Sequence, residues 1–526
     1  MSEAAHEAGR GRIHRVAILL FILLLAAGAA LRLSRLSVRP LHGDEAVGAH
    51  ISAEAGRTGS FHYESSNRHG PFQYFLGGLA MRWGGDSFFW IRFPHALLGC
   101  LLPLACLGFR RSLKEPGWLL GCSLLTFSPM FVYYSRYAIQ EIDFTVATAL
   151  LLACGLSFAR GGRAGSLFGA LLAAAWMVTI KETFVIVWGC LAGAMALAML
   201  AGGSRVRSSL EEAAQRARRQ PLAVFSGVCA AALLVAIAYT DFFRDASGLT
   251  NLVRNLGSMV AHGASTADAV SLHRHPASFY ASILLRHEWL TLALALAGIL
   301  CAVRTRRPLT LILAFDALLT ATIHFMLPYK TPWLLLTPLL PLALLAGLGG
   351  EWVLSRLHAG FPKRWALVAA CLLPMGMLPQ AIDASFLRPA EPSLGLAYHH
   401  ASAEQIELAG RIRRIIEKLP EGTYPKAVIA LPYYWPLAWY LRDKMAVIFE
   451  ASAIPVEPME ALETVPVVLT LESADPRFLD AFLRSESVPP FDLPGHTGRS
   501  VLLVAPHYMV GRLWIRNDLI SQATPP

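Results

Sequence analysis

The stretch VAILLFILLLAAGAAL at residues 16–31 decides the class of protein that this chain forms. It carries no charge, and as a helix with its flanking residues it is long enough to cross the apolar core of a bilayer. Ten further apolar runs follow at 89–109, 117–135, 144–159, 164–180, 182–201, 222–240, 289–303, 309–327, 332–350 and 365–382. A hydropathy window of about 19 residues therefore predicts a polytopic α-helical membrane protein with about eleven spans.

The composition of the whole chain agrees with this class. Of its 526 residues, 55% are hydrophobic and only 16% are charged. This composition excludes a water-soluble enzyme, and the many large apolar residues exclude a disordered chain. The formal net charge is +10. Because the basic residues flank the apolar runs and do not form one stripe, we expect the lipid bilayer, and no nucleic acid, as a partner.

Basic residues in the short loops predict how the chain is oriented. With the N-terminus in the cytoplasm, the cytoplasmic segments are about threefold richer in Lys and Arg per residue than the outer ones. They contain Arg10, Arg12, Arg15, Arg110, Arg111, Lys114, Arg160, Arg163, Arg205, Arg207, Arg216, Arg218, Arg219, Arg304, Arg306, Arg307, Arg356, Lys363 and Arg364. We therefore expect a multi-pass protein of the inner (cell) membrane with an extracytoplasmic C-terminus. A cleavable signal peptide is the competing interpretation of the first span.

Three long segments are predicted to lie outside. Two are loops of a transmembrane domain at 1–382, namely the first external loop at 32–88 and the fourth at 241–288. The third, at 383–526, is predicted to be a small soluble α/β domain. It has an amphipathic helix at 402–418, apolar runs at 427–431, 446–449, 465–471 and 501–504, and a helix near 476–484. Strands that alternate with helices favour a three-layer unit.

The most unusual outer stretch is His-Gly-Asp-Glu-Ala at 42–46, in which Asp44 and Glu45 are adjacent. Two neighbouring carboxylates raise each other's pKa unless a cation neutralises them. One of them could serve as a general base towards an acceptor hydroxyl. The alternative is that Asp44 only caps a surface helix that runs to about Gly56, with Glu45 in its first turn.

Other outer turns carry charges whose roles are open. Arg136 is a candidate phosphate clamp, and Glu141 and Asp143 are candidate ligands of a shared divalent cation or contacts of the acceptor. Lys181 precedes Glu182 within a long apolar stretch, where an ionisable pair is costly and therefore a functional candidate. The alternatives are headgroup-layer charges and a snorkelling lysine.

Three further outer residues are candidates of the same kind. Lys330 lies in a tight turn flanked by aromatics and is either a phosphate contact or an interface anchor. His42 and His69 either orient the carboxylates and contact a substrate, or are ordinary loop histidines. Under the predicted topology all these groups share the outer side. That suits a substrate whose lipid tail lies in the bilayer and whose phosphate lies at the surface.

These residues resemble those of a known group, the GT-C superfamily of integral-membrane glycosyltransferases. The branch is that of dolichyl-phosphate-mannose–protein mannosyltransferases and lipid A aminoarabinose transferases, and the narrower likeness is to the flippase activity-associated family. The resemblance rests on 42–46, on His-Gly-Pro-Phe at 69–72, on 128–143, on Lys-Glu-Thr at 181–183, on Tyr-Lys-Thr-Pro-Trp at 329–333 and on Trp-Pro-Leu-Ala-Trp-Tyr-Leu-Arg at 435–442.

The resemblance implies transfer of a sugar from a polyprenyl-phosphate carrier to a protein, lipid or glycan acceptor outside the cytoplasm, with inversion. It implies that Asp44 is the base and that Glu45 positions substrate, with Arg136, Lys181 and Lys330 near the donor phosphate. It leaves open whether a divalent cation such as Mg²⁺ or Mn²⁺ takes part. The alternative functions are a lipid-linked sugar flippase or a non-catalytic assembly protein.

Overall fold

The computed structural model describes residues 3–64, 69–110, 112–264, 273–357, 363–398, 400–442, 446–474, 488, 490–504 and 509–520. The chain forms two compact units. The helical unit consists of Met1–Val38, Ile51–Gly263 and His275–Pro389, and the C-terminal unit of Arg39–His50, Ala264–Arg274 and Ala390–Pro526. The helix expected near 476–484 lies outside the described residues.

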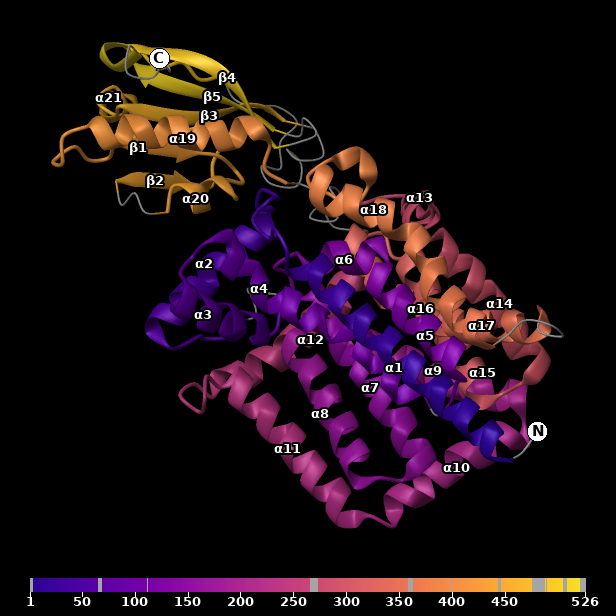
Figure 1. The fold of residues 1–526 in the computed structure, drawn as a ribbon. Helices are drawn as coiled ribbons and strands as arrows, with labels where there is room; N and C mark the ends of the chain where they lie inside the picture. The colour runs from indigo at the N-terminus through magenta and orange to yellow at the C-terminus, as the bar shows by residue number, and fades with distance from the viewer. Residues whose placement is uncertain are drawn as a thin grey trace. The chain divides into compact units, whose positions relative to one another are not determined.

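The helical unit is built almost entirely of helices (Figure 1). They are α1 (Glu3–Leu33), α2 (Gly43–Thr58, which begins in the C-terminal unit), α3 (Phe72–Gly84), α4 (Phe88–Gly99), η2 (Leu102–Phe109), α5 (Glu115–Phe127), α6 (Pro129–Ser135), α7 (Glu141–Gly161), α8 (Ala164–Ile180), α9 (Phe184–Gly202), α10 (Ser204–Arg218), α11 (Pro221–Tyr239), α12 (Ser247–Ala264), α13 (Ala277–His287), α14 (Trp289–Thr305), α15 (Pro308–Met326), η4 (Pro332–Leu335), α16 (Leu336–Leu357), α17 (Lys363–Leu372), η5 (Leu373–Met377), α18 (Leu378–Ile382) and η6 (Asp383–Leu387). The most extensively packed pairs are α14 with α16, α7 with α8, α11 with α8, and α15 with α9.

Within the described residues, eight helical segments are long and apolar enough to cross a membrane. They are His14–Leu33, Phe88–Phe109, Glu141–Gly161, Phe184–Gly202, Pro221–Tyr239, Pro308–Met326, Pro332–Arg356 and Trp365–Leu387. The bent pair Ala277–His287 and Trp289–Thr305 makes a ninth if it is one span. The chain is therefore an integral, multi-pass membrane protein, as the apolar runs predicted.

Eight of the eleven predicted runs meet this requirement of length and hydropathy as single helical segments, and the other three fall short of it for identifiable reasons. The run at 117–135 is divided because Pro129 starts α6 after α5 has ended at Phe127, and the Ser128 side chain caps the new helix. α8 has only 17 residues, and α14 is bent by 99° from the helix that precedes it. Mean hydropathy does not register such breaks.

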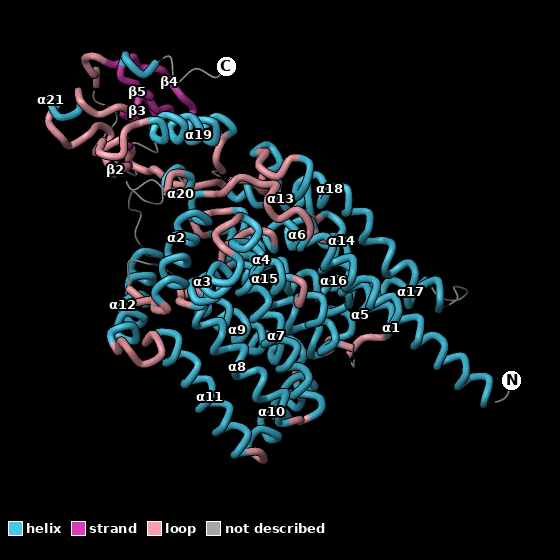
Figure 2. Tube along the Cα trace, turned by 60° about the vertical axis from the view of Figure 1, so that its left-hand side comes forward, coloured by secondary structure: helices cyan, strands magenta, loops and turns pink. Residues whose placement is uncertain are grey.

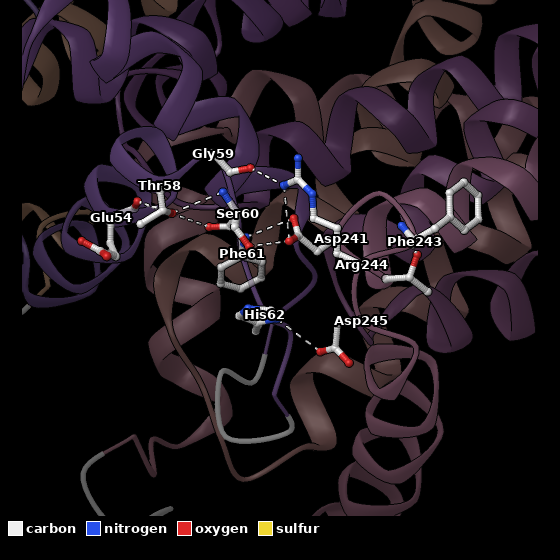
Figure 3. Close-up of polar contacts among 11 residues, drawn as sticks. Glu54, Thr58, Gly59, Ser60, Phe61, His62, Asp241, Phe243, Arg244 and Asp245 are labelled. Carbon is white, nitrogen blue, oxygen red and sulfur yellow. Dashed lines mark hydrogen bonds and ion pairs between the residues drawn. The ribbon is translucent and has the colours of Figure 1, made fainter.

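The first external loop is fastened to the end of α11 by a buried carboxylate (Figure 3). Asp241 accepts hydrogen bonds from the Ser60 hydroxyl and, at 3.2 Å, from the Phe61 N–H. Arg244 lies 3.6 Å from the same carboxylate and donates to the Gly59 carbonyl at 2.7 Å. Asp241 itself has a left-handed backbone, with φ of 48°. Short polar residues such as Asp tolerate that conformation best.

The C-terminal unit contains a five-stranded mixed sheet of order β2-β1-β3-β5-β4 (Figure 2). Its strands are β1 (Ala427–Ala430), β2 (Val447–Glu450), β3 (Val467–Ala474), β4 (His496–Val504) and β5 (Met509–Arg516). β1 pairs in parallel with β2 and β3, whereas β5 pairs antiparallel with β3 and β4. The four apolar runs correspond to β1 to β4, and β5 was not anticipated.

Both faces of this sheet are covered. One face packs against α19 (Ala403–Lys418) and α20 (Leu437–Tyr440), with Ile412 and Ile415 on one side and Ile429 and Leu469 on the other. The opposite face carries Val428, Val468 and Trp514 and packs against Leu462 of α21 (Met459–Leu462). α19 begins as predicted because the Ser402 hydroxyl accepts the N–H of Gln405 at 3.0 Å.

Candidate active site

The residues around the acid pair form a capping box at the start of α2. His42 precedes the helix, and its Nδ1 accepts the N–H of Asp44 at 2.9 Å. Glu45 reaches back, and its Oε2 accepts the N–H of His42 at 3.2 Å. This reciprocal arrangement satisfies backbone donors that the first turn leaves open. His42 is therefore the residue that caps the helix, and Asp44 is not.

The two carboxylates differ sharply in exposure. The Glu45 side chain is fully buried and lies 3.6 Å from the guanidinium of Arg39, which is itself buried. A buried carboxylate needs such a cation because the interior solvates charge poorly. The Asp44 side chain is 57% exposed. Glu45 thus shapes the turn, and Asp44 presents its carboxylate outward.

Asp44 has few partners of its own. The closest charged contact that the described residues give its carboxylate is Nδ1 of His42 at 3.8 Å, which is too long for a hydrogen bond. Burial lowers the pKa of His42 from 6.5, against the opposing effect of Asp44 and Glu45, so the imidazole stays neutral. Since Nδ1 accepts the Asp44 N–H, the proton of this neutral ring is on Nε2. The carboxylate of Asp44 is the group left to accept a proton from outside.

A tyrosine from the C-terminal unit lies against the glycine of the motif. A Cβ built on Gly43 would lie 1.9 Å from the Tyr433 hydroxyl, so only glycine permits this approach. Burial raises the pKa of Tyr433, and the charge of Asp44 raises it further. The phenol therefore stays protonated beside the acid pair.

Backbone contacts hold the motif on the C-terminal residues of the same unit. The N–H of Leu41 donates to the Tyr440 hydroxyl at 3.2 Å, and the N–H of Ala401 donates to the Leu41 carbonyl at 3.2 Å. His42 pairs with His400 in an isolated antiparallel bridge, and their ring centroids lie 5.4 Å apart. The start of α2 is therefore an integral part of this unit.

The helical unit holds the remaining predicted site residues. Lys181 ends α8, and its Nζ donates to Glu141 Oε1 at 2.6 Å, with both side chains buried. Lys181 is the C-cap residue of α8, and α9 starts three residues later, at Phe184. The lysine and glutamate therefore form a buried ion pair between the C-terminal end of α8 and the N-terminal end of α7.

Lys330 lies in the turn between α15 and η4. Its Nζ donates to the Leu327 carbonyl and is 6.0 Å from the centre of the Tyr280 ring. The residue is 3% exposed, and burial lowers the pKa of its amine. This lysine is the kind of buried cation that an anionic ligand would stabilise.

His69 meets Glu182, the residue next to Lys181 in the sequence, in a polar network. Nδ1 of His69 is 3.5 Å from Glu182, whose Oε1 accepts from Asn255 of α12 at 3.0 Å. Asn255 also donates to the Tyr63 hydroxyl at 2.7 Å. The N–H of Gly70 donates to the Ile180 carbonyl at 3.0 Å. Residues 69 and 70 are thereby held by contacts with Ile180 and Glu182, at the break between α8 and α9.

The comparisons with known proteins agree on one architecture. Residues 68–216 match the family model for dolichyl-phosphate-mannose-protein mannosyltransferase. Curated protein sequences give no significant match. Among solved structures, ArnT from Cupriavidus metallidurans in the apo state superposes with a TM-score of 0.61 at 14% identity, over 96% of this chain and 99% of that one. The same protein bound to undecaprenyl phosphate gives 0.62 at the same identity and coverage.

A third structure extends the likeness. The Archaeoglobus fulgidus oligosaccharyltransferase, tethered with an acceptor peptide, superposes with a TM-score of 0.53 at 13% identity, over 86% of this chain and 69% of that one. The chain has the GT-C glycosyltransferase fold. This is the fold that the resemblance of the sequence motifs implied. At such identities the roles of single residues must come from the geometry of this chain.

The Arg136 side chain is held by backbone carbonyls. Its guanidinium donates to four carbonyls at the end of α1, namely Leu31, Arg32, Ser34 and Arg35, at 2.5–3.2 Å. It also lies 4.1 Å from the centre of the Phe386 ring. These carbonyls have no partners within a helix that ends there. The contacts make Arg136 the cap of α1, and a role as phosphate clamp stays a prediction.

Glu141 and Asp143 have separate partners. Whereas Glu141 contacts Lys181, Asp143 Oδ2 is 2.9 Å from Nδ1 of His95, and both groups are buried. Residues two apart on a helix point about 200° from each other, which explains the divergence. In the part of the chain that the structure describes, no three His, Cys, Asp or Glu side chains are grouped to hold a metal.

Four residues of these clusters were not anticipated from the sequence: His95, Asn255, Tyr433 and Tyr440. His95 and Asn255 are single polar residues in apolar or amphipathic helices, and such residues are usually buried beside a polar partner. Tyr433 precedes the aromatic stretch at 435–442 and Tyr440 lies within it, and that stretch was singled out only by its resemblance, with no role for either tyrosine. Their proximity to the acid pair has no local signature.

Proposed function

We propose that this chain is a glycosyltransferase that moves a sugar from a polyprenyl-phosphate carrier to an acceptor hydroxyl on the extracytoplasmic side, with inversion. Three observations support the proposal: the GT-C fold over nearly the whole chain, the mannosyltransferase family match, and the undecaprenyl phosphate bound by one structural neighbour. The other neighbour is tethered with an acceptor peptide, which supports an acceptor as the second substrate.

The observation that carries the proposal is the asymmetry of the acid pair. Glu45 is buried and bound to Arg39, so it holds the turn, whereas the half-exposed Asp44 is available to an incoming hydroxyl. Asp44 takes the hydroxyl proton while the acceptor oxygen forms a bond to the anomeric carbon. The bond from that carbon to the phosphate oxygen breaks, and its electron pair stays on the phosphate.

The leaving phosphate gains negative charge and requires cations. We assign this role to Lys181 and Lys330, both of which are buried in the helical unit. Lys181 is already paired with Glu141, which holds its amine in place until a phosphate competes for it. Loss of one such donor commonly costs about 10²–10³ in rate. The cytoplasmic N-terminus predicted from the basic loops would put these groups on the outer side.

The direct test uses purified protein and a panel of polyprenyl-phosphate sugars, with release of the lipid phosphate as the readout. We expect Asp44→Asn to abolish release while the protein still inserts and folds, because the amide accepts no proton at neutral pH. Asp86→Asn, at an exposed acid after α3, is the matched control and should keep full activity. Undiminished turnover in purified Asp44→Asn would refute the assigned base.

Metal dependence is tested in the same assay by chelation with EDTA. Because Lys181 and His95 occupy the carboxylates of Glu141 and Asp143, we expect turnover to survive chelation. Loss of activity that only Mg²⁺ or Mn²⁺ restores would show that a cation displaces these partners.

A further inference from the structure

A row of aromatic side chains follows the same face of α2 as the motif glycine. Tyr433 lies against Gly43, and the ring of Trp435 is 5.5 Å from the ring of His50. Gly43 and His50 are seven residues apart, which brings them back to one face after two helical turns. The loop at 433–435 therefore runs along this face of α2, beginning beside the acid pair.

The row continues onto the sheet of the C-terminal unit. The Tyr434 ring is 5.9 Å from that of Trp435 and 5.3 Å from that of Phe449 in β2. Tyr434, Trp435 and Phe449 are each half-buried, and His50 is exposed. We call His50, Tyr434, Trp435 and Phe449 the aromatic strip.

The strip occupies a favourable place in the α/β unit. Its loop follows β1, which lies between two parallel neighbours, β2 and β3. Loops at the carboxyl ends of parallel strands are where α/β folds usually bind ligands, because side chains from several strands converge there. Here that edge also borders the exposed carboxylate of Asp44.

This juxtaposition specifies what the strip would contact. If Asp44 is the base, the acceptor hydroxyl must come within hydrogen-bond reach of it, so the rest of the acceptor covers the adjoining surface. The strip offers aromatic ring faces, and Asp44 beside it offers a hydrogen-bond acceptor. Such a surface suits a ligand that has both flat C–H faces and hydroxyls. A sugar ring has both, and the exposed carboxylate of Asp44 beside the strip disfavours an anionic acceptor.

We propose that the aromatic strip is the acceptor subsite and that the acceptor is a neutral glycan whose ring stacks on Trp435. The inference rests on the proposed function, which supplies the role of Asp44. Asp44 and His50 are six residues apart, a rise of about 9 Å along the helix. The acceptor is therefore longer than a single ring, with its reactive hydroxyl at Asp44 and a second ring on the strip.

The test measures binding without turnover. Full-length protein in nanodiscs, free of sugar-headed detergent, is studied by saturation-transfer NMR with maltose, cellobiose, lactose and mannobiose as probes. Glucuronic acid and a Ser/Thr-rich peptide serve as competing ligand classes. We expect transfer to the ring C–H protons of at least one neutral disaccharide. His50→Ala and Trp435→Ala should each weaken it severalfold, and Trp435→Phe should restore most of it.

The matched control is Trp83→Ala, because Trp83 is an 80% exposed tryptophan of α3 in the helical unit. It should bind like the unmodified protein. His50→Ala changes an exposed helix position and keeps the test valid if Trp435→Ala fails to fold. Absence of transfer to every neutral disaccharide, transfer to the peptide alone, or signals unchanged in both strip variants would overturn the inference.

The two proposals fail in different ways. Lipid-phosphate release with no sugar bound at the strip would leave the proposed function standing and refute the glycan subsite. Sugar binding that depends on His50 and Trp435, without release from any donor tested, would count against the transferase and support a glycan site at the strip.

Discussion

Replacing Gly43 by alanine tests whether Tyr433 and the acid pair are packed as the structure shows. The new Cβ would lie 1.9 Å from the Tyr433 hydroxyl oxygen and 2.9 Å from the ring carbon that bears it. Ordinary contact begins near 3.4 Å. The start of α2 or the tyrosine must therefore move by about 1.5 Å to reach ordinary van der Waals contact.

The expected effect on activity exceeds the effect on stability. Overpacking costs about 1–3 kcal/mol, and the better helix propensity of alanine returns up to about 1 kcal/mol. The net loss of folding free energy is thus about 0–2 kcal/mol. A catalytic group displaced by about 1 Å loses about 10²-fold in rate. Gly43→Ala should therefore fold, melt a few degrees lower and lose nearly all lipid-phosphate release.

The assay compares melting temperature and lipid-phosphate release in Gly43→Ala, in Tyr433→Phe, in the double variant and in a control. Gly48→Ala is the matched control, since a Cβ there meets nothing within 4 Å and alanine favours the same helix. Tyr433→Phe in the Gly43→Ala background removes the closest oxygen and should recover part of the lost activity. Unchanged activity in Gly43→Ala, or no coupling between the two positions, would refute the packing of Tyr433 on the motif.

Three further changes test other parts of the structure. Arg39→Met should lower the free energy of unfolding by about 3–5 kcal/mol because Glu45 is left buried without its cation, and Arg39→Met with Glu45→Gln should recover much of this in thermal unfolding. Asp241→Ala should lower the free energy of unfolding by about 1.5–3 kcal/mol, because the Ser60 hydroxyl and the Phe61 N–H lose a carboxylate acceptor. Asp241→Asn should melt closer to the unmodified protein. Equal melting temperatures of the two variants and the unmodified protein would contradict the role of Asp241 in holding residues 60 and 61. Burial and the neighbouring Glu457 raise the pKa of Glu450 from 4.5 to about 7, so the folded state binds this proton more tightly; the resulting stability is complete below pH 4.5 and is lost as the pH rises through 7. Relative to Glu450→Gln, the unmodified protein should therefore lose melting temperature over that range, and parallel pH profiles would refute the shift.

Local sequence signals carried much of the interpretation. The apolar runs located every helix later found to be long enough to span a membrane, because burial in lipid demands an uninterrupted apolar stretch. They did not reveal the breaks at Pro129 and before α14, because mean hydropathy does not register a break in the backbone. In the C-terminal unit, β1 to β4 and α19 were predictable from short-range patterns.

The acid pair marks the limit of such signals. Its place in the first turn of a helix follows from the residues at 42–46, since a capping box uses only near neighbours. Which carboxylate is exposed depends on Arg39 and on packing by residues some 390 positions later, such as Tyr433. The pattern alone therefore left open whether Asp44 was a cap or a base.

The sequence by itself determined a multi-pass helical membrane protein, an acidic helix start after its first span, and an α/β sheet near its end. These follow from periodicity and propensity, which act over a few residues. Only the tertiary structure decided that Glu45 is buried and Asp44 exposed, that Arg136 caps α1, and that Glu141 and Asp143 face different partners. Burial and charge pairing depend on which distant segments pack together, and short-range patterns do not encode that.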